Sequence, residues 1–189
     1  MKKLIKSHLN GKKILLLFLI TNFVYGFMLL VTIPKVMSFS DGIKLLDMMP
    51  IGYNAEYVNT LFNTLGEKGR FLYLYRQIPI DMVYPFLFGV SYFLILAYFL
   101  NKLNKLKSLF YYLCFLPVIA GIFDYFENIG IIFMLSNYPS YSQNLIMSTN
   151  LFTIIKSITT SIYFIVLIVV LVLVGLKTIK QKQELNHSK

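Results

Sequence analysis

The chain has 189 residues, of which 57% are hydrophobic, 16% aromatic and only 14% charged, and its mean hydropathy is +0.68. This composition excludes an ordinary soluble domain and indicates an integral membrane protein, with one all-α domain over residues 1–189. A net charge of +10 would indicate nucleic-acid binding in a soluble protein. Here the lysines collect in short segments beside apolar runs, as the positive-inside rule describes, so we expect no nucleic-acid partner.

The residue types used for metal binding and nucleophilic catalysis are scarce. Cys114 is the only cysteine and lies in an apolar run, while His8 and His187 lie in the polar ends of the chain. This distribution argues against an intramolecular disulfide, a CxxC motif, a histidine-based zinc site and a Ser/His/Asp triad. We therefore expect no metal and no cofactor.

The first predicted membrane span is the apolar run 14–33, which follows a segment with five lysines and ends before Pro34. A membrane-spanning helix needs about 20 residues. The apolar part of a signal peptide has about 7 to 15 residues and precedes a small-residue cleavage site, which is not found after this run. We interpret the run as a retained span.

Residues 34–79 are amphipathic and mixed in charge, and they are too many for a structureless loop in a compact protein. An apolar face at helical spacing predicts a short helix, with Asn54 as N-cap and Gly66 as the stop. That face consists of Val58, Leu61, Phe62 and Leu65. The segment 70–77 combines aromatic residues with arginine, which is typical of a membrane interface. We expect a helical extracytoplasmic lid; a partner-binding domain is the alternative.

Three further spans are expected at residues 80–100, 109–135 and 151–176. The linker before the third span contains three lysines, whereas the connection 136–150 has no charged residue, and a lysine-bearing tail follows the fourth span. This bias places the linker and both termini on the cytoplasmic side of the cell membrane. The sequence therefore predicts a four-transmembrane-helix bundle.

Asp124, Glu127 and Asn128 lie inside the third apolar run, where carboxylates are costly unless they find partners or water. From the helical rise, Asp124 lies roughly 22 Å from the inner boundary of a core about 30 Å thick, and Lys156 of the fourth span roughly 8 Å below the outer boundary. Asp81 lies at the outer start of the second span. We expect these groups to meet in the outer leaflet.

Two interpretations of this cluster stay open. In the first, Lys156 pairs with Asp124 or Glu127, and Asn128 completes a structural network that fixes the helix register. In the second, three carboxylates against one lysine leave an acid unpaired and able to exchange protons at neutral pH. Arg70 balances the charge if the lid folds inward.

The second interpretation predicts a site for an amphiphilic small molecule that enters from the membrane lipids. A reaction such as a double-bond shift needs one group to donate a proton and another to remove one. The candidate catalytic residues are Asp124, Glu127 and Asp81. The candidate ligand-binding or network residues are Asn128, Lys156, Arg70, Tyr73 and Tyr84. The alternatives are a proton-linked transporter and a structural or regulatory membrane subunit, and the sequence does not decide between them and catalysis.

Two stretches carry a resemblance, GEKGRFLYLYRQIPIDMVYP (66–85) and PVIAGIFDYFENIG (117–130). They resemble a group of uncharacterised four-span bacterial membrane proteins with a GxxGRxxY stretch, a DxxYP motif and a later DxxEN segment. The matching positions are Gly66, Gly69, Arg70, Tyr73, Asp81, Tyr84, Pro85, Asp124, Glu127 and Asn128. The resemblance implies a four-span layout in a bacterial membrane and no particular activity. The layout is also similar to the sterol-isomerase-like EXPERA group, by analogy alone, because the tryptophan expected in that site is absent.

Overall fold

The computed structural model describes residues 9–106 and 109–187, without the side chains of 185–187. Every regular element in these ranges is a helix, and four helices are long and apolar enough to cross a membrane. The all-α class and the number of candidate spans are therefore confirmed. The topology prediction also draws on lysines outside the described residues, which are Lys2, Lys3, Lys6, Lys107 and Lys189.

The first long helix consists of three consecutive elements, α2 (Gly11–Phe27), a π-helical turn (Met28–Thr32) and α3 (Ile33–Met37). The side chain of Asn10 caps its start by accepting a hydrogen bond from the backbone N–H of Lys12. The prediction that Pro34 closes the helix is wrong. A proline ring crowds the carbonyl group four residues earlier, and the wider π-helical turn just before Pro34 relieves that crowding.

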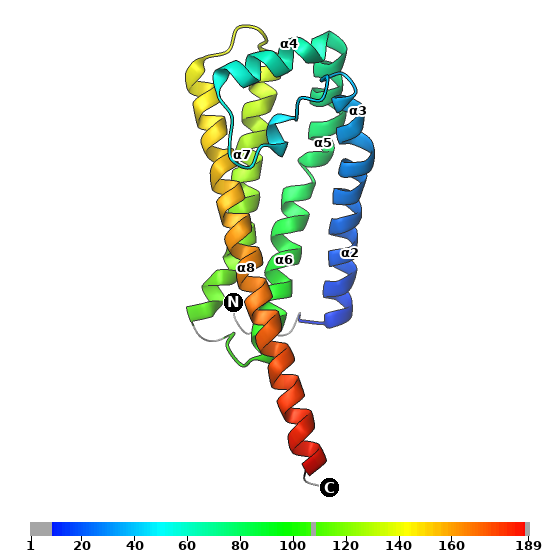
Figure 1. Cartoon of the computed structure of the whole chain (residues 1–189), viewed down its shortest axis with the longest axis vertical. Helices are drawn as coiled ribbons and strands as arrows, with labels where there is room; N and C mark the ends of the chain where they lie inside the picture. The colour runs from blue at the N-terminus through cyan, green and yellow to red at the C-terminus, as the bar shows by residue number, and fades with distance from the viewer. Residues whose placement is uncertain (1–8, 107–108, 188–189) are drawn as a thin grey trace.

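Residues 38–66, which we call the cap, cross one end of the bundle (Figure 1). The cap contains a short 3-10 helix, Leu46–Met48, and most of α4 (Ala55–Leu72). The N-cap prediction is confirmed, since the Asn54 side chain accepts a hydrogen bond of 2.8 Å from the backbone N–H of Tyr57. The predicted apolar face is buried. At Gly66 the backbone adopts φ 59° and ψ −173°, a conformation open almost only to glycine, and the chain turns down along the bundle.

The second long helix starts at this corner, before the predicted start at Ile80. Its remaining parts are a second π-helical turn (Tyr73–Gln77), α5 (Ile78–Asp81) and α6 (Tyr84–Lys102). Pro79 follows the second π-helical turn as Pro34 follows the first. The same relief of crowding therefore keeps the chain helical where the sequence predicted the end of the lid.

The third and fourth spans also differ from their predicted bounds. Residues Leu109–Phe115 form a 3-10 helix that leads into α7 (Leu116–Ser136). Pro117 lies in the first turn of α7, where its missing N–H costs no helical hydrogen bond. The fourth span is α8 (Gln143–His187), whose 45 residues extend past both predicted ends. Its C-terminal part projects beyond the bundle (Figure 1).

The long helices pack in the order α2, α6, α7, α8, with α8 also touching α6. Two glycines permit close approach. A Cβ on Gly121 would lie 2.7 Å from the carbonyl oxygen of Pro85, and one on Gly130 would collide with the side chain of Thr149. α2 and α8 are thus the two outer helices of this order, as Figure 1 shows for the part of the bundle next to the cap.

Candidate functional site

The charged groups expected to meet inside the bundle do meet. The Nζ atom of Lys156 on α8 lies 3.2 Å from Oδ1 of Asp124 on α7, and Lys156 also forms an ion pair with Glu127. The hydroxyl of Thr153 donates a hydrogen bond of 2.8 Å to Oε1 of Glu127. Residues three or four apart share a helix face, so Asp124 and Glu127 lie on the face of α7 that meets the Lys156 side of α8.

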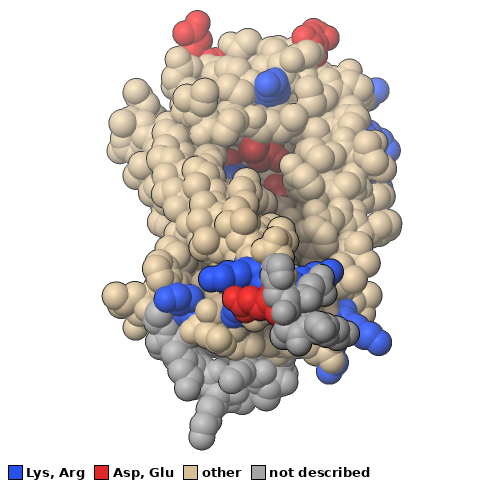
Figure 2. Space-filling model, turned by 60° about the horizontal axis from the view of Figure 1, so that its bottom comes forward, with Lys and Arg blue, Asp and Glu red and all other residues tan. Residues whose placement is uncertain are grey.

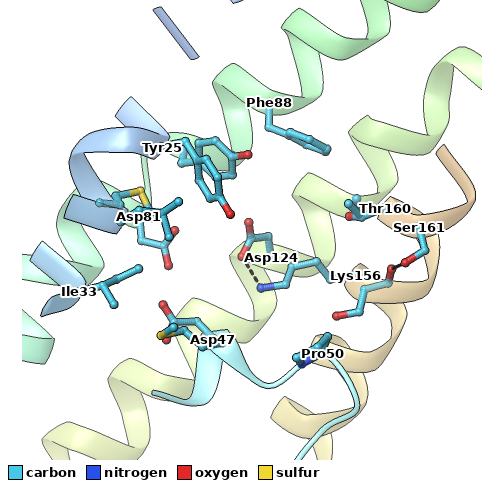
Figure 3. Close-up of a pocket in the computed structure, with 16 residues that line it drawn as sticks. Tyr25, Ile33, Asp47, Pro50, Asp81, Phe88, Asp124, Lys156, Thr160 and Ser161 are labelled. Atoms are coloured by element: carbon cyan, nitrogen blue, oxygen red, sulfur yellow. Dashed lines mark hydrogen bonds and ion pairs between the residues drawn. The ribbon is translucent and has the colours of Figure 1, made fainter. Parts of the chain in front are cut away.

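A cavity of about 440 Å³ lies beside the Lys156–Asp124 ion pair. Its polar lining includes Asp47, Asp81, Asp124, Lys156, Thr160 and Ser161, and its apolar lining includes Leu29 and Phe88. Figure 3 shows these acids and Lys156 turned toward the same space. We call it the acidic cavity.

The acidic cavity reaches the surface between the first long helix and α8. Tyr25 and Leu29, which line it from the first long helix, are each 41% exposed, and Ser161, which lines it from α8, is also exposed. Figure 2 shows acidic and basic atoms inside a hollow whose rim consists mainly of uncharged residues. The mouth is thus on the side of the bundle, where the helix surfaces are apolar.

The three candidate catalytic acids have different surroundings. Asp124 and Asp81 both line the cavity, whereas Glu127 does not, is 0% exposed and lies against Lys156 and Thr153. Asp81 is only 4% exposed, and within the described part of the chain it makes no hydrogen bond or ion pair. The acid left without a partner is therefore Asp81. Glu127 instead helps to hold Lys156.

Asp47 is a site residue that the sequence interpretation missed. It comes from the short 3-10 helix of the cap and lines the cavity opposite Asp124 (Figure 3). Its Oδ1 accepts a hydrogen bond of 2.8 Å from the hydroxyl of Tyr73. The predicted residue Tyr73 is fully buried and does not line the cavity itself. No local pattern marks Asp47, because its position depends on how the cap folds back.

Two tyrosines stack at one wall of the cavity. Tyr84, a predicted site residue, lines it from α6, and its ring stacks on that of Tyr25 with centroids 5.2 Å apart. Tyr25 was not predicted to belong to the site. Its position as a polar residue in the middle of the first apolar run is the signal that would have identified it.

Tyr53 attaches the cap to α8 next to the ion pairs. Its backbone N–H donates a hydrogen bond of 2.7 Å to the side chain of Asn150. Burial is the largest effect on the Tyr53 hydroxyl and raises its pKa. Glu127 also raises this pKa, whereas Thr153 and Lys156 lower it. The hydroxyl is therefore neutral at physiological pH, and it is close enough to Lys156 and Glu127 to interact with their charges.

Arg70 and Asn128 do not take their expected places. The guanidinium of Arg70 lies 3.9 Å from the ring centre of Tyr138 and donates a hydrogen bond of 2.7 Å to the carbonyl of Phe62, so it does not balance the acids. Asn128 is fully buried, and neither polar atom of its side chain has a hydrogen-bond partner in the described structure. The expected network is therefore formed by Lys156, Glu127 and Thr153 without it.

No protein-family model, curated protein or solved structure matches this chain. The resemblance to four-span bacterial membrane proteins stays a prediction. Among the described residues, no group of three or more His, Cys, Asp or Glu side chains is arranged to hold a metal ion.

Proposed function

We propose that this is a four-span membrane protein whose acidic cavity binds a lipid-like or amphiphilic small molecule that enters from the outer leaflet. The observation that supports this proposal is the cavity itself, with acids in its interior and an opening between α2 and α8. An amphiphile fits such a site, because its polar head can reach the acids while its chain stays among apolar side chains. A purely structural cluster fits less well, since Asp81 faces open space without a partner.

The proposed topology has both termini in the cytoplasm of a bacterial cell and the cap outside the cell membrane. The start of α2 and the end of α6 lie at the end of the bundle opposite the cap (Figure 1), and lysines in these segments, Lys12, Lys13 and Lys102, support the proposal. Lys177 at that end donates a hydrogen bond of 2.8 Å to the carbonyl of Lys102. Clusters of lysine beside membrane spans favour the cytoplasmic side. The cap then covers the cavity from the outer side.

We further propose that the cavity acids exchange protons with the bound molecule. Asp124 and Asp81 both line the cavity, and only Asp124 has a cation beside it. Two carboxyl groups in unlike surroundings suit the separate roles of proton acceptor and proton donor. In this scheme Glu127 is a positioning residue that fixes Lys156 next to Asp124.

Both halves of the proposal can be tested on protein purified in a mild detergent. Mass spectrometry of extracts should find an amphiphilic molecule retained by the wild type and depleted at least fivefold in Asp124→Asn. In D₂O, the same molecule should gain deuterium at carbon with the wild type and not with Asp81→Asn or Asp124→Asn. Asp41→Asn is the matched control, because Asp41 lies outside the cavity lining and its positive φ of 49° suits asparagine.

The outcomes separate binding from proton exchange. If no amphiphile is retained by the wild type, the binding proposal fails. If a molecule is retained but gains no deuterium, the protein binds without acid–base processing. Equal depletion in Asp41→Asn and Asp124→Asn would show that the loss is not due to the cavity.

A further inference from the structure

The charges around the acidic cavity do not balance. Three described lining residues are carboxylic acids, Asp47, Asp81 and Asp124, and Lys156 is the one described lining residue with a basic side chain. Lys156 is moreover shared between Asp124 and the fully buried Glu127. The site therefore has one ammonium group for four carboxyl groups.

Asp81 is the acid of the cavity that lacks a positively charged partner. It is 4% exposed, lines the cavity and has no hydrogen-bond or ion-pair partner within the described ranges. Figure 3 shows its carboxyl group facing the cavity and not the surrounding helices. A buried carboxylate without a partner is costly, and a cation in the cavity would offset that cost by pairing with the ionised form of Asp81.

The volume and the aromatic lining of the cavity favour an organic cation over a metal ion as its ligand. About 440 Å³ is far more than a bare ion fills and falls in the range of small-molecule sites. One wall carries aromatic rings, since Tyr25 stacks on Tyr84 and Phe88 lies 5.7 Å from Tyr84 between ring centres. Aromatic faces attract ammonium groups, and quaternary ammonium ligands are commonly bound between such rings.

We infer that the molecule bound in the acidic cavity is a cationic amphiphile, whose ammonium head lies between Asp81 and the Tyr25–Tyr84 wall. Its hydrocarbon chain leaves through the mouth beside Leu29 and Ser161. This inference rests on the proposed function and adds the charge of the ligand to it. The head group fills the space facing Asp81, which no side chain of the described structure fills.

The test compares three probes with the same chain, namely dodecyltrimethylammonium, dodecanol and dodecanoate. Each is titrated calorimetrically against the full-length protein in nanodiscs of zwitterionic lipid, with empty nanodiscs to subtract partitioning into lipid. The cationic probe should bind the wild type at least tenfold more tightly than the other two. Asp81→Asn should weaken the cationic probe about tenfold and leave dodecanol unchanged, and Asp41→Asn should change neither.

Each negative result of the titrations contradicts a different part of the inference. Equal binding of the cationic and neutral probes to the wild type, or an equal loss of both in Asp81→Asn, overturns the cationic head and leaves the amphiphile site intact. Tighter binding of dodecanoate would assign the head group to Lys156 instead. If none of the probes exceeds the empty nanodiscs, both the inference and the proposed function fail. Thermal unfolding of Asp81→Asn checks that a loss of binding is not a loss of fold.

Discussion

Gly130 brings α7 and α8 together, because any side chain there would occupy the place of Thr149. Gly130→Ala should therefore lower the free energy of unfolding by about 1–3 kcal/mol, the usual cost of overpacking. Thermal unfolding in detergent measures the change. Gly175→Ala on the same helix pair is the control, since a Cβ at Gly175 meets nothing within 4 Å; equal destabilisation by both would contradict the contact.

Lys156 neutralises two carboxylates at once. Lys156→Met should lower the free energy of unfolding by about 3–5 kcal/mol, because both buried acids lose their cation. Glu127→Gln alone should cost less, since Asp124 still pairs with Lys156. The double variant should be more stable than the sum of the two changes implies, by about 1–3 kcal/mol.

Chemical unfolding of the four proteins in this cycle measures the coupling. Lys68→Met removes an exposed lysine of α4 and should have little effect. Additive losses in the cycle would show that Lys156 and Glu127 do not act on each other. The measurement therefore separates the ion pair from a general loss of charge.

Individual residues of the site could be predicted from the sequence where the cost of a charge inside the membrane singles them out. A charged side chain in an apolar run must find a partner, and this rule identifies Asp124, Glu127 and Lys156 from the sequence alone. It assigns the partners imperfectly, because helical spacing gives the face of a residue but not its neighbour across the bundle. The unpaired acid is thus Asp81, and Glu127, proposed from sequence as catalytic, holds Lys156.

At the scale of elements, Gly66 determines where the cap ends and the second long helix begins. Its backbone φ of 59° is strained for any L side chain, although the space beside it is open. Gly66→Ala should therefore cost about 1–3 kcal/mol of unfolding free energy from backbone strain alone. Thermal unfolding measures it, and Gly26→Ala, also in open space but in α2, should be neutral or slightly stabilising.

Element boundaries follow from sequence where the signal is local. The Asn54 cap and the Gly66 stop depend on a few neighbouring atoms, and both predictions are confirmed. Pro34 and Pro79 misled the prediction, because a π-helical turn before each of them accommodates the ring and continues the helix. A preference for such turns is not visible in residue spacing.

For the whole molecule, the orientation in the membrane can be tested with single cysteines. In a Cys114→Ala background, Asn144→Cys should react with an impermeant maleimide in intact cells, and Lys182→Cys should react only after permeabilisation. Both positions are exposed, whereas Cys114 is buried, so labelling reports the side of the membrane. The reverse pattern would place the cap in the cytoplasm and overturn the outer-leaflet proposal.

The arrangement of the cap over the bundle was not predictable from sequence. Asp47 enters the cavity because Tyr73 holds it and Asn150 fixes the neighbouring backbone at Tyr53. These contacts join residues far apart in the chain, which periodicity and capping rules do not describe. The cavity between cap and helices is accordingly a finding of the structure.

On the proposed topology and with a cationic ligand, the depth of the acidic cavity, which Lys156 lines, would link its occupancy to the electrical state of the cell. On the proposed topology, a monovalent cation that reaches it from outside crosses roughly a quarter of the hydrocarbon core, from the depth of roughly 8 Å in about 30 Å. Moving one charge through the full field corresponds to about 2.3 kcal/mol per 100 mV. Each 100 mV of potential, negative inside, would therefore favour the bound cation by about 0.6 kcal/mol, roughly a threefold gain in affinity. At a ligand concentration that half-fills the site, a 100 mV depolarisation would therefore lower its occupancy to about a quarter.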